Sequence, residues 1–234
     1  MIPGARVGIL GGTLDPIHVG HLETARAART ALDLERVIVV PARVPPHRLE
    51  EPAASGYHRF AMAALCAADH DWMVVSDDEL TAPGPSFTAE TLDRYRASGL
   101  RPSQIFFITG ADAFAEIETW HRFPEVLDLG HFAVVSRPGL PVGALAARLP
   151  SLTSRFLPPA QARETGDRPA VFLIDAATPD VSSTEVRRRL HLGERVTGLV
   201  CPAVERHIRR HNLYGVTSGI RMASLRANHL HGED

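Results

Sequence analysis

Two histidines that follow a pair of glycines form the pattern in this sequence with the clearest chemistry. The run GGTLDPIHVGHL begins at Gly11 and places His18 and His21 three residues apart. Adjacent glycines leave backbone N–H groups open to an anion, and the dipole and free N–H groups of a helix N-terminus favour phosphate. Imidazoles on one face of the first helical turn can donate to the same anion. The pattern therefore predicts a triphosphate cradle that also includes Gly12 and Thr13.

The same run permits two other interpretations. It lacks the Gly-Lys-Ser/Thr ending of a Walker loop and the three spaced glycines of a dinucleotide fingerprint, so it could be an ordinary strand–helix connection. Asp15, His18 and His21 also have a spacing that could serve a divalent metal, although no further ligand cluster lies near them in the sequence. We therefore expect no metal ion held by protein side chains.

A second candidate anion site lies near the C-terminal end, where residues 181–187 read VSSTEVR. Ser182 and the glutamate three residues later have the spacing of a helix-capping box. Capping does not account for Ser183 and Thr184 in the first helical turn together with Arg187, whose side chain can reach back to that helix N-terminus. The segment therefore predicts an anion clamp.

The two arginines that follow this clamp, Arg188 and Arg189, are interpreted as solvated surface residues. The alternative is a basic helix that reads DNA. The formal net charge of −2 and the lack of a preceding recognition-motif turn argue against that alternative.

Short apolar runs alternate with helical patterns along the chain. The expected strands are Val7–Leu10, Val37–Val40, Met73–Ser76, Ile105–Ile108, Phe132–Ser136 and Val171–Ile174. The expected helices are His21–Leu32, Arg59–Ala68, Thr88–Ser98, Asp112–Trp120, Ser183–Leu192 and Pro202–His211. This alternation is typical of βαβ units. We expect a three-layer α/β fold with a doubly wound parallel sheet and a site at the carboxyl ends of its strands.

The composition fits one globular domain. Of the 234 residues, 44% are apolar or aromatic, which supports a sizeable core. We expect a single domain over 1–214, a mobile tail over 215–234 and loops over 41–56 and 140–166, with a short helix inside the second loop at 143–149. No run approaches the roughly 20 apolar residues of a membrane helix. Cys66 and Cys201 lack the spacing of a disulfide framework, so we expect unpaired thiols in a reducing cytoplasm.

The N-terminal run resembles the signature of the nucleotidyltransferases with a His-x-Gly-His motif. Among these it is most similar to the bacterial nicotinate mononucleotide adenylyltransferases, with Leu14 and Phe87 standing where that family more often has Phe and Tyr. The resemblance extends from about Val7 to Tyr214, with the motifs in family order. It implies a Rossmann-like nucleotidyltransferase fold and adenylyl transfer from ATP to nicotinate mononucleotide, which yields nicotinate adenine dinucleotide and pyrophosphate in NAD biosynthesis.

The resemblance also implies the contacts to ATP. The Ser-Thr-x-x-Arg motif at 183–187 would bind the β and γ phosphates, and the Gly-x-Asp motif at 110–112 would contact ribose hydroxyls. The proline-rich loop at 41–48, otherwise a plain surface loop, is similar to a Pro-Pro-His-Lys segment and would lean over the phosphates. The implied ATP-binding residues are Gly11, Gly12, Thr13, His18, His21, Arg48, Gly110, Asp112, Ser183, Thr184 and Arg187.

A pyridine-nucleotide pocket is implied in the same way. The Trp120 indole would stack on the nicotinate ring, and backbone N–H groups around Thr88 and His121 would meet its carboxylate. Arg137, in a strand-end Ser-Arg-Pro-Gly segment, would hold the mononucleotide phosphate. From the residues alone, Ser86 or Thr88 would cap a helix and Trp120 would be a core aromatic residue.

The implied reaction needs no protein nucleophile, because a phosphate monoester is already largely a dianion near neutral pH. His18, His21 and Arg187 would be the catalytic residues, with Mg²⁺ bound mainly through the ATP phosphates. The alternatives are an adenylyltransferase or cytidylyltransferase for another phosphorylated acceptor, such as phosphopantetheine, and a non-catalytic nucleotide-binding regulator. We expect ATP and nicotinate mononucleotide as partners, no nucleic acid and no membrane, and the chain is compatible with a homo-oligomer.

Overall fold

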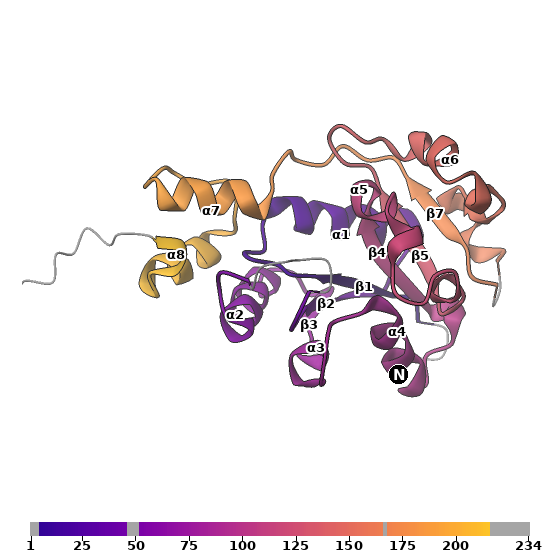
Figure 1. Cartoon of the computed structure of the whole chain (residues 1–234), viewed down its shortest axis with the longest axis horizontal. Coiled ribbons are helices and arrows are strands. Elements are labelled where there is room, and N and C mark those ends of the chain that lie inside the picture. The colour runs from indigo at the N-terminus through magenta and orange to yellow at the C-terminus, as the bar shows by residue number, and fades with distance from the viewer. Residues whose placement is uncertain (1–4, 46–51, 166–167, 216–234) are drawn as a thin grey trace, which may run out of the picture.

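The computed structural model describes residues 5–45, 52–165 and 168–215, and within them the chain builds one seven-stranded sheet (Figure 1). Its strands are β1 (Val7–Gly12), β2 (Arg36–Pro41), β3 (Met73–Val75), β4 (Ile105–Gly110), β5 (His131–Val135), β6 (Phe156–Leu157) and β7 (Val171–Ile174). The strand order is β3-β2-β1-β4-β5-β7-β6, and every pairing is parallel. The prediction of a doubly wound parallel sheet is confirmed.

Helices cover both faces of this sheet. They are α1 (Val19–Leu32), α2 (Gly56–Ala67), α3 (Asp78–Thr81), α4 (Thr88–Ala97), α5 (Ala111–Phe114), α6 (Leu145–Arg148), α7 (Ser183–His191) and α8 (Pro202–Arg210). Figure 1 shows α1 along one side of the sheet and α4 on the other. Successive strand residues alternate between two buried clusters, as in β4, where Phe106 and Ile108 pack with α1 and Ile105 and Phe107 with α4. Burial on both faces explains why the strands are continuous apolar runs.

The structure corrects two of the expected elements. The helix expected over Asp112–Trp120 is divided into α5 and a separate 3₁₀ turn at Ile117–Thr119, because the amide of Glu116 bonds to the carbonyl three residues back rather than four. The loop expected over 140–166 contains the short helix predicted at 143–149, which is α6, but also several 3₁₀ turns and β6, which were not expected. A two-residue edge strand is too short to produce a periodic signal in the sequence.

The order of the strands places a crevice at the carboxyl ends of β1 and β4. The chain builds the sheet outward from β1 through β2 to β3, and then returns to the other side of β1 to form β4. Crevices at such a reversal of strand order are the usual ligand sites of open α/β sheets. Gly12 ends β1 and Gly110 ends β4, so the two predicted glycine motifs meet at this crevice.

The two cysteines are brought together by two helices that pack against each other, contrary to our expectation of unpaired thiols. Cys66 lies in α2 and Cys201 immediately precedes α8, and their sulfur atoms are joined in a disulfide across 135 residues of sequence. Their spacing in the sequence could not reveal this pairing, because it depends on the packing of α8 on α2. The prediction of unpaired cysteines is wrong for this structure.

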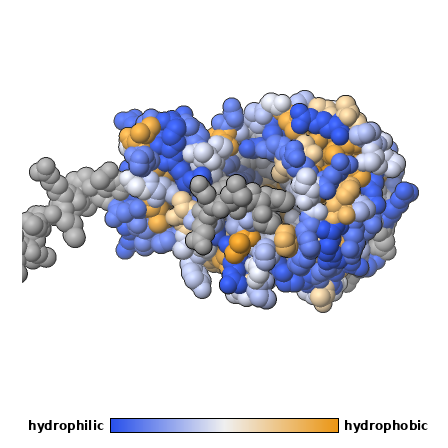
Figure 2. Space-filling view, viewed as in Figure 1, coloured by the Kyte–Doolittle hydropathy of each residue, from blue (hydrophilic) through white to orange (hydrophobic). Residues whose placement is uncertain are grey.

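The helices α7 and α8 form one end of the molecule (Figure 1). On the side shown in Figure 2 the surface of α7 is mainly hydrophilic, which agrees with the ion pairs that Arg188 and Arg189 make with Glu185. The interpretation of these arginines as surface residues is confirmed. Among the described helices, none is long and apolar enough to cross a membrane. The predicted tail beyond Gly215 lies outside the described residues.

Candidate active site

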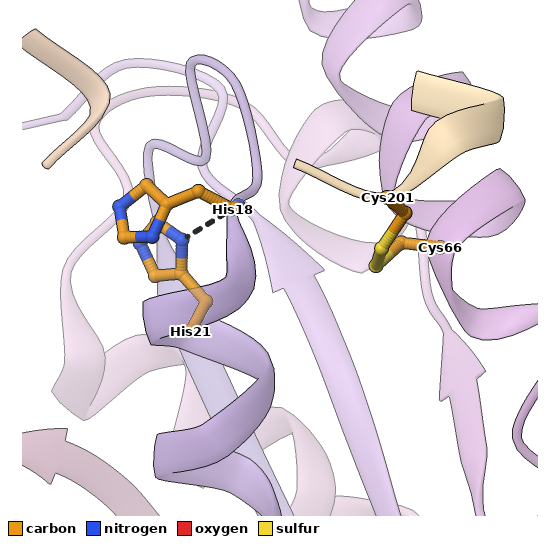
Figure 3. Close-up of a disulfide and its surroundings, with 4 residues drawn as sticks. All are labelled: His18, His21, Cys66 and Cys201. Atoms are coloured by element: carbon orange, nitrogen blue, oxygen red, sulfur yellow. Dashed lines mark hydrogen bonds between the residues drawn. A yellow bond between two sulfur atoms is a disulfide. The ribbon is translucent and has the colours of Figure 1, made fainter. Parts of the chain in front are cut away.

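His18 and His21 stand together at the N-terminus of α1, at the carboxyl end of β1. His18 is the N-cap residue, and its backbone N–H donates to Nδ1 of His21 at 3.2 Å. Their ring centroids are 3.7 Å apart, and Figure 3 shows the two rings lying against each other. Because Nδ1 of His21 accepts this bond, a neutral His21 ring carries its proton on Nε2. The helix start therefore presents an imidazole N–H donor beside its free backbone N–H groups.

Both imidazoles are held in the neutral form. Burial, with a smaller effect of the nearby Arg137 guanidinium, lowers the pKa of His18 from 6.5 to about 3. Burial also lowers the pKa of His21 well below its ordinary value, with added effects from His18 and Arg137. A side chain at Gly20 would crowd His18 and Arg137, because a Cβ there would lie 3.0 Å from the His18 ring and 3.2 Å from Arg137 Nη1. The glycine between the histidines therefore gives the room that the sequence pattern predicted.

Asp15, three residues before His18, is an internal anchor of this loop. Its buried carboxylate accepts hydrogen bonds from the backbone N–H groups of Ala53 and Ala54 and from the Tyr214 hydroxyl, at 2.8, 3.1 and 2.7 Å. These three bonds engage both carboxylate oxygens of Asp15 in contacts within the protein. Across the part of the chain that the structure describes, no group of three or more His, Cys, Asp or Glu residues is arranged to hold a metal ion.

The predicted anion clamp at the start of α7 folds onto the same loop. Ser182 caps the helix, since its hydroxyl accepts the backbone N–H of the residue three positions on at 3.1 Å. The Ser183 hydroxyl donates to the carbonyl of Pro16 at 3.0 Å, and Arg187 donates to the carbonyl of Asp15 at 2.7 Å. Arg187 also donates to the hydroxyl of the clamp threonine at 3.3 Å. Two motifs about 170 residues apart in sequence thus form one polar surface, whereas the capping interpretation alone explains only Ser182.

We call this surface the phosphate end and define it as His18, His21, Arg137, Ser183, Thr184 and Arg187. Arg137 joins it from the end of β5, with its Nε 4.0 Å from an oxygen of Asp112. Gly110 is needed for this approach, because a Cβ at that position would lie 2.4 Å from the Asp112 carboxylate and 3.0 Å from Arg137. The Gly-x-Asp motif therefore places an exposed carboxylate at the rim of the phosphate end.

A cavity of about 390 Å³ opens beside the phosphate end, and we call it the ring pocket. Its described lining consists of Gly11, Gly12, Thr13, Ala42, Pro45, Glu79, Ser86, Phe87, Thr88, Phe107, Thr109, Ala113, Trp120 and His121. The Trp120 indole is partly buried and meets the Phe107 ring edge-on, and the Phe87 ring stacks on His121 at 4.2 Å. Thr88, Trp120 and His121 line this one cavity, and their binding of a mononucleotide stays a prediction. The N-cap of α4 is Phe87 without a side-chain bond, so the capping interpretation of this segment is wrong.

The structure brings most of the predicted residues to one crevice but distributes them differently. Gly11, Gly12 and Thr13, which we expected at the triphosphate, line the ring pocket. Arg48 lies outside the described residues. The sequence analysis missed Arg59, which is buried in α2 and donates to the carbonyl of Thr13 at 2.7 Å. A charged residue inside the apolar pattern of α2 was the available signal for that role.

Comparison with known proteins gives the family. The family described as cytidylyltransferase-like matches residues 9–189. The chain is 39% identical over 212 residues to a "probable nicotinate-nucleotide adenylyltransferase" of Roseiflexus sp. (strain RS-1), which covers 90% of this chain and 98% of the relative. A protein of the same name from Moorella thermoacetica is 38% identical over 91% of this chain and 92% of its own length.

The chain belongs to the nicotinate-nucleotide adenylyltransferase family. Solved structures agree on the fold: a Plasmodium falciparum nicotinic acid mononucleotide adenylyltransferase complexed with NaAD superposes with a TM-score of 0.68 at 16% identity. The match covers 91% of this chain and 98% of that one. Within the family's Rossmann-like sheet, the phosphate end and the ring pocket of this adenylyltransferase-family chain are two parts of one crevice.

Proposed function

We propose that this chain transfers the adenylyl group of ATP to nicotinate mononucleotide. One observation carries the proposal: the glycine turn 11–13 lines the ring pocket that contains Trp120, and it leads within five residues to His18 at the phosphate end. A flat ring in the pocket would therefore have its phosphate close to donors suited to a second nucleotide's phosphates. The names of the relatives support the same reaction.

In this reaction a phosphate oxygen of the mononucleotide attacks the α-phosphorus of ATP. A new phosphorus–oxygen bond forms, the bond between the α-phosphorus and the bridging oxygen to the β-phosphate breaks, and pyrophosphate leaves with the electron pair. The nucleophile is already anionic near neutral pH, so no side chain has to remove a proton from it. The chain's task is positioning and charge stabilisation.

The residues at the phosphate end fit that task. The neutral His21 ring would donate through Nε2 to an α- or β-phosphate oxygen, and Arg187 with Ser183 would hold the leaving pyrophosphate. Arg137, adjacent to the histidines, would neutralise the phosphate of the mononucleotide. We propose that Mg²⁺ enters on the ATP phosphates, where it would offset their charge. We also propose that the reaction takes place in the cytoplasm.

The ring pocket would select its substrate through backbone N–H groups near Thr88 and His121. A carboxylate accepts from every such donor, whereas an amide presents its own NH₂ to one of them and leaves a buried donor unpaired. Each mismatch costs about 1 to 3 kcal/mol, so two would separate the acid and amide mononucleotides by roughly 100-fold or more in kcat/KM.

Pyrophosphate release with ATP and a panel of acceptors tests the proposal. We expect turnover of nicotinate mononucleotide at least about 100-fold better in kcat/KM than of nicotinamide mononucleotide. Equal values for the two would contradict the pocket chemistry. Turnover of phosphopantetheine instead of either mononucleotide would refute the proposed substrate, and nucleotide binding without release of pyrophosphate would indicate a regulator.

A further inference from the structure

Glu79 is the one acidic side chain in the described lining of the ring pocket, and that lining contains no lysine or arginine. Its side chain lies in the short helix α3 and is 5% exposed. A buried carboxylate is expensive unless hydrogen-bond donors satisfy it. The site described above gives this residue no part in binding or chemistry, so its presence in the pocket calls for a reason.

The side chains around Glu79 come from the start of α4 and from the residues just before that helix. The Thr91 hydroxyl, in the first turns of α4, donates to Oε1 of Glu79 at 2.5 Å. The Ser86 side chain lowers the pKa of Glu79, against the effect of burial, and both residues line the same pocket. Ser86 in turn accepts the backbone N–H of Arg43 at 2.8 Å, and Arg94 donates to the Thr91 hydroxyl at 2.9 Å. The Thr91 hydroxyl also lies 3.2 Å from the carbonyl oxygen of Phe87, so it connects the Glu79 carboxylate to the backbone of the pocket wall.

This arrangement fixes the segment that carries two walls of the pocket. Phe87 and Thr88 lie between Ser86 and Thr91, and both line the cavity. The turn before them includes Gly84 in the left-handed region at φ +81°, and the backbone N–H of Ser86 bonds to Val44 at 2.9 Å. Burial raises the pKa of Glu79, and the Thr91 and Ser86 side chains and the Arg94 charge oppose part of that rise.

We propose that Glu79 is a positioning residue of the ring pocket, which acts through Thr91 and Ser86 to hold the 86–88 backbone in the orientation that receives the substituent of the pyridine ring. This inference rests on the proposed function. It assigns to Glu79 an effect on the mononucleotide alone, because the phosphate end is held by other segments of the chain.

Steady-state kinetics of Glu79→Gln with both substrates provide the test. The amide keeps the size of the side chain but removes its negative charge, so the charge-assisted bond from Thr91 becomes a weaker neutral one. We expect the KM for nicotinate mononucleotide to rise about tenfold or more, with the KM for ATP within about twofold of the parent. Glu116→Gln, an exposed carboxylate outside the pocket lining, is the matched control and should change neither KM.

A double-variant cycle separates positioning from a general loss of structure. Thr91→Val keeps the volume and removes the hydroxyl, and it should raise the same KM. Because both side chains form one bond, Glu79→Gln with Thr91→Val should cost no more than the larger single change. If Glu79→Gln does not fold, Thr91→Val and Ser86→Ala make the same test.

Three results would overturn the inference: unchanged KM values, equal rises for both substrates, or additive effects in the double variant. A parent protein that does not use nicotinate mononucleotide would instead contradict the proposed function. The two failures are therefore distinguishable within one set of assays.

Discussion

The phosphate end and the ring pocket are built from contacts of very different sequence range. At the phosphate end, Ser183 and Arg187 reach residues 167 and 172 positions away, and Tyr214 reaches Asp15 across 199 positions. In the ring pocket, Thr91 bonds to Glu79 across 12 positions and Arg43 to Ser86 across 43. The phosphate end thus depends on the two ends of the described chain meeting, whereas the bonds around the 86–88 wall of the ring pocket span much shorter stretches. Changes in α7 and α8 should therefore affect ATP and spare the mononucleotide ring.

The largest effect is expected from the histidine that donates at the phosphate end. His21→Ala should lower kcat by about 100- to 1,000-fold, the usual cost of one preorganised donor to developing charge. Its ring is not part of the apolar core and its bond at the helix start is with the N–H of His18, so the protein should still fold, with a melting temperature somewhat below that of the parent. Turnover within threefold of the parent, in a folded protein, would show that His21 is not catalytic.

Loss of the disulfide should destabilise the phosphate end, which depends on long-range contacts. The double variant Cys66→Ser/Cys201→Ser, measured by urea unfolding, should lose about 2 to 4 kcal/mol of stability. The KM for ATP should rise while the KM for the mononucleotide is kept, because Leu199, two residues before Cys201, accepts the backbone N–H of Val19 at the start of α1. A thiol count of two in the oxidised native protein would contradict the pairing itself.

The anion clamp allows a more selective change. Arg187→Ala removes charge-assisted bonds worth roughly 1.5 to 3 kcal/mol, which corresponds to about 10- to 150-fold in apparent affinity. We expect this rise in the KM for ATP and little change for the mononucleotide. Arg188→Ala, one position along on the exposed face, is the control. Unaltered KM and kcat for Arg187→Ala would leave this residue with a purely structural role.

The smallest effect concerns His18 and the pH dependence of stability. The unfolded chain binds a proton at this residue near pH 6.5, while the folded protein excludes it down to about pH 3. Between these values the free energy of unfolding should fall by about 1.4 kcal/mol for each pH unit of acidification on account of His18. Urea unfolding at pH 5.5 and 4.5 should show a shallower loss in His18→Gln. An equal slope in the two proteins would show that the folded imidazole is protonated.

The sequence predicted the sheet because its strands are buried on both faces and are therefore continuous apolar runs. It predicted which residues meet at the crevice because the glycine and histidine motifs follow strand ends. It could not predict the bond from Tyr214 to Asp15 or the Cys66–Cys201 pairing, since both depend on how α8 packs. The role of Glu79 was hidden for a different reason: neither its type nor its spacing shows that the Thr91 hydroxyl donates to it beside the ring pocket.

Arg187 and Tyr214 bond to the loop before α1, and Leu199 bonds to the first residue of α1. These bonds have a consequence for folding during synthesis. A chain is made from its N-terminus, at about 5 to 20 residues per second. Both motif histidines therefore leave the ribosome early, while the segments that fix their loop are synthesised only at the end. A nascent chain stopped before α7 already contains His18 and His21 but has none of these three partners for their loop. The motif that is translated first is thus the last to acquire its tertiary hydrogen bonds.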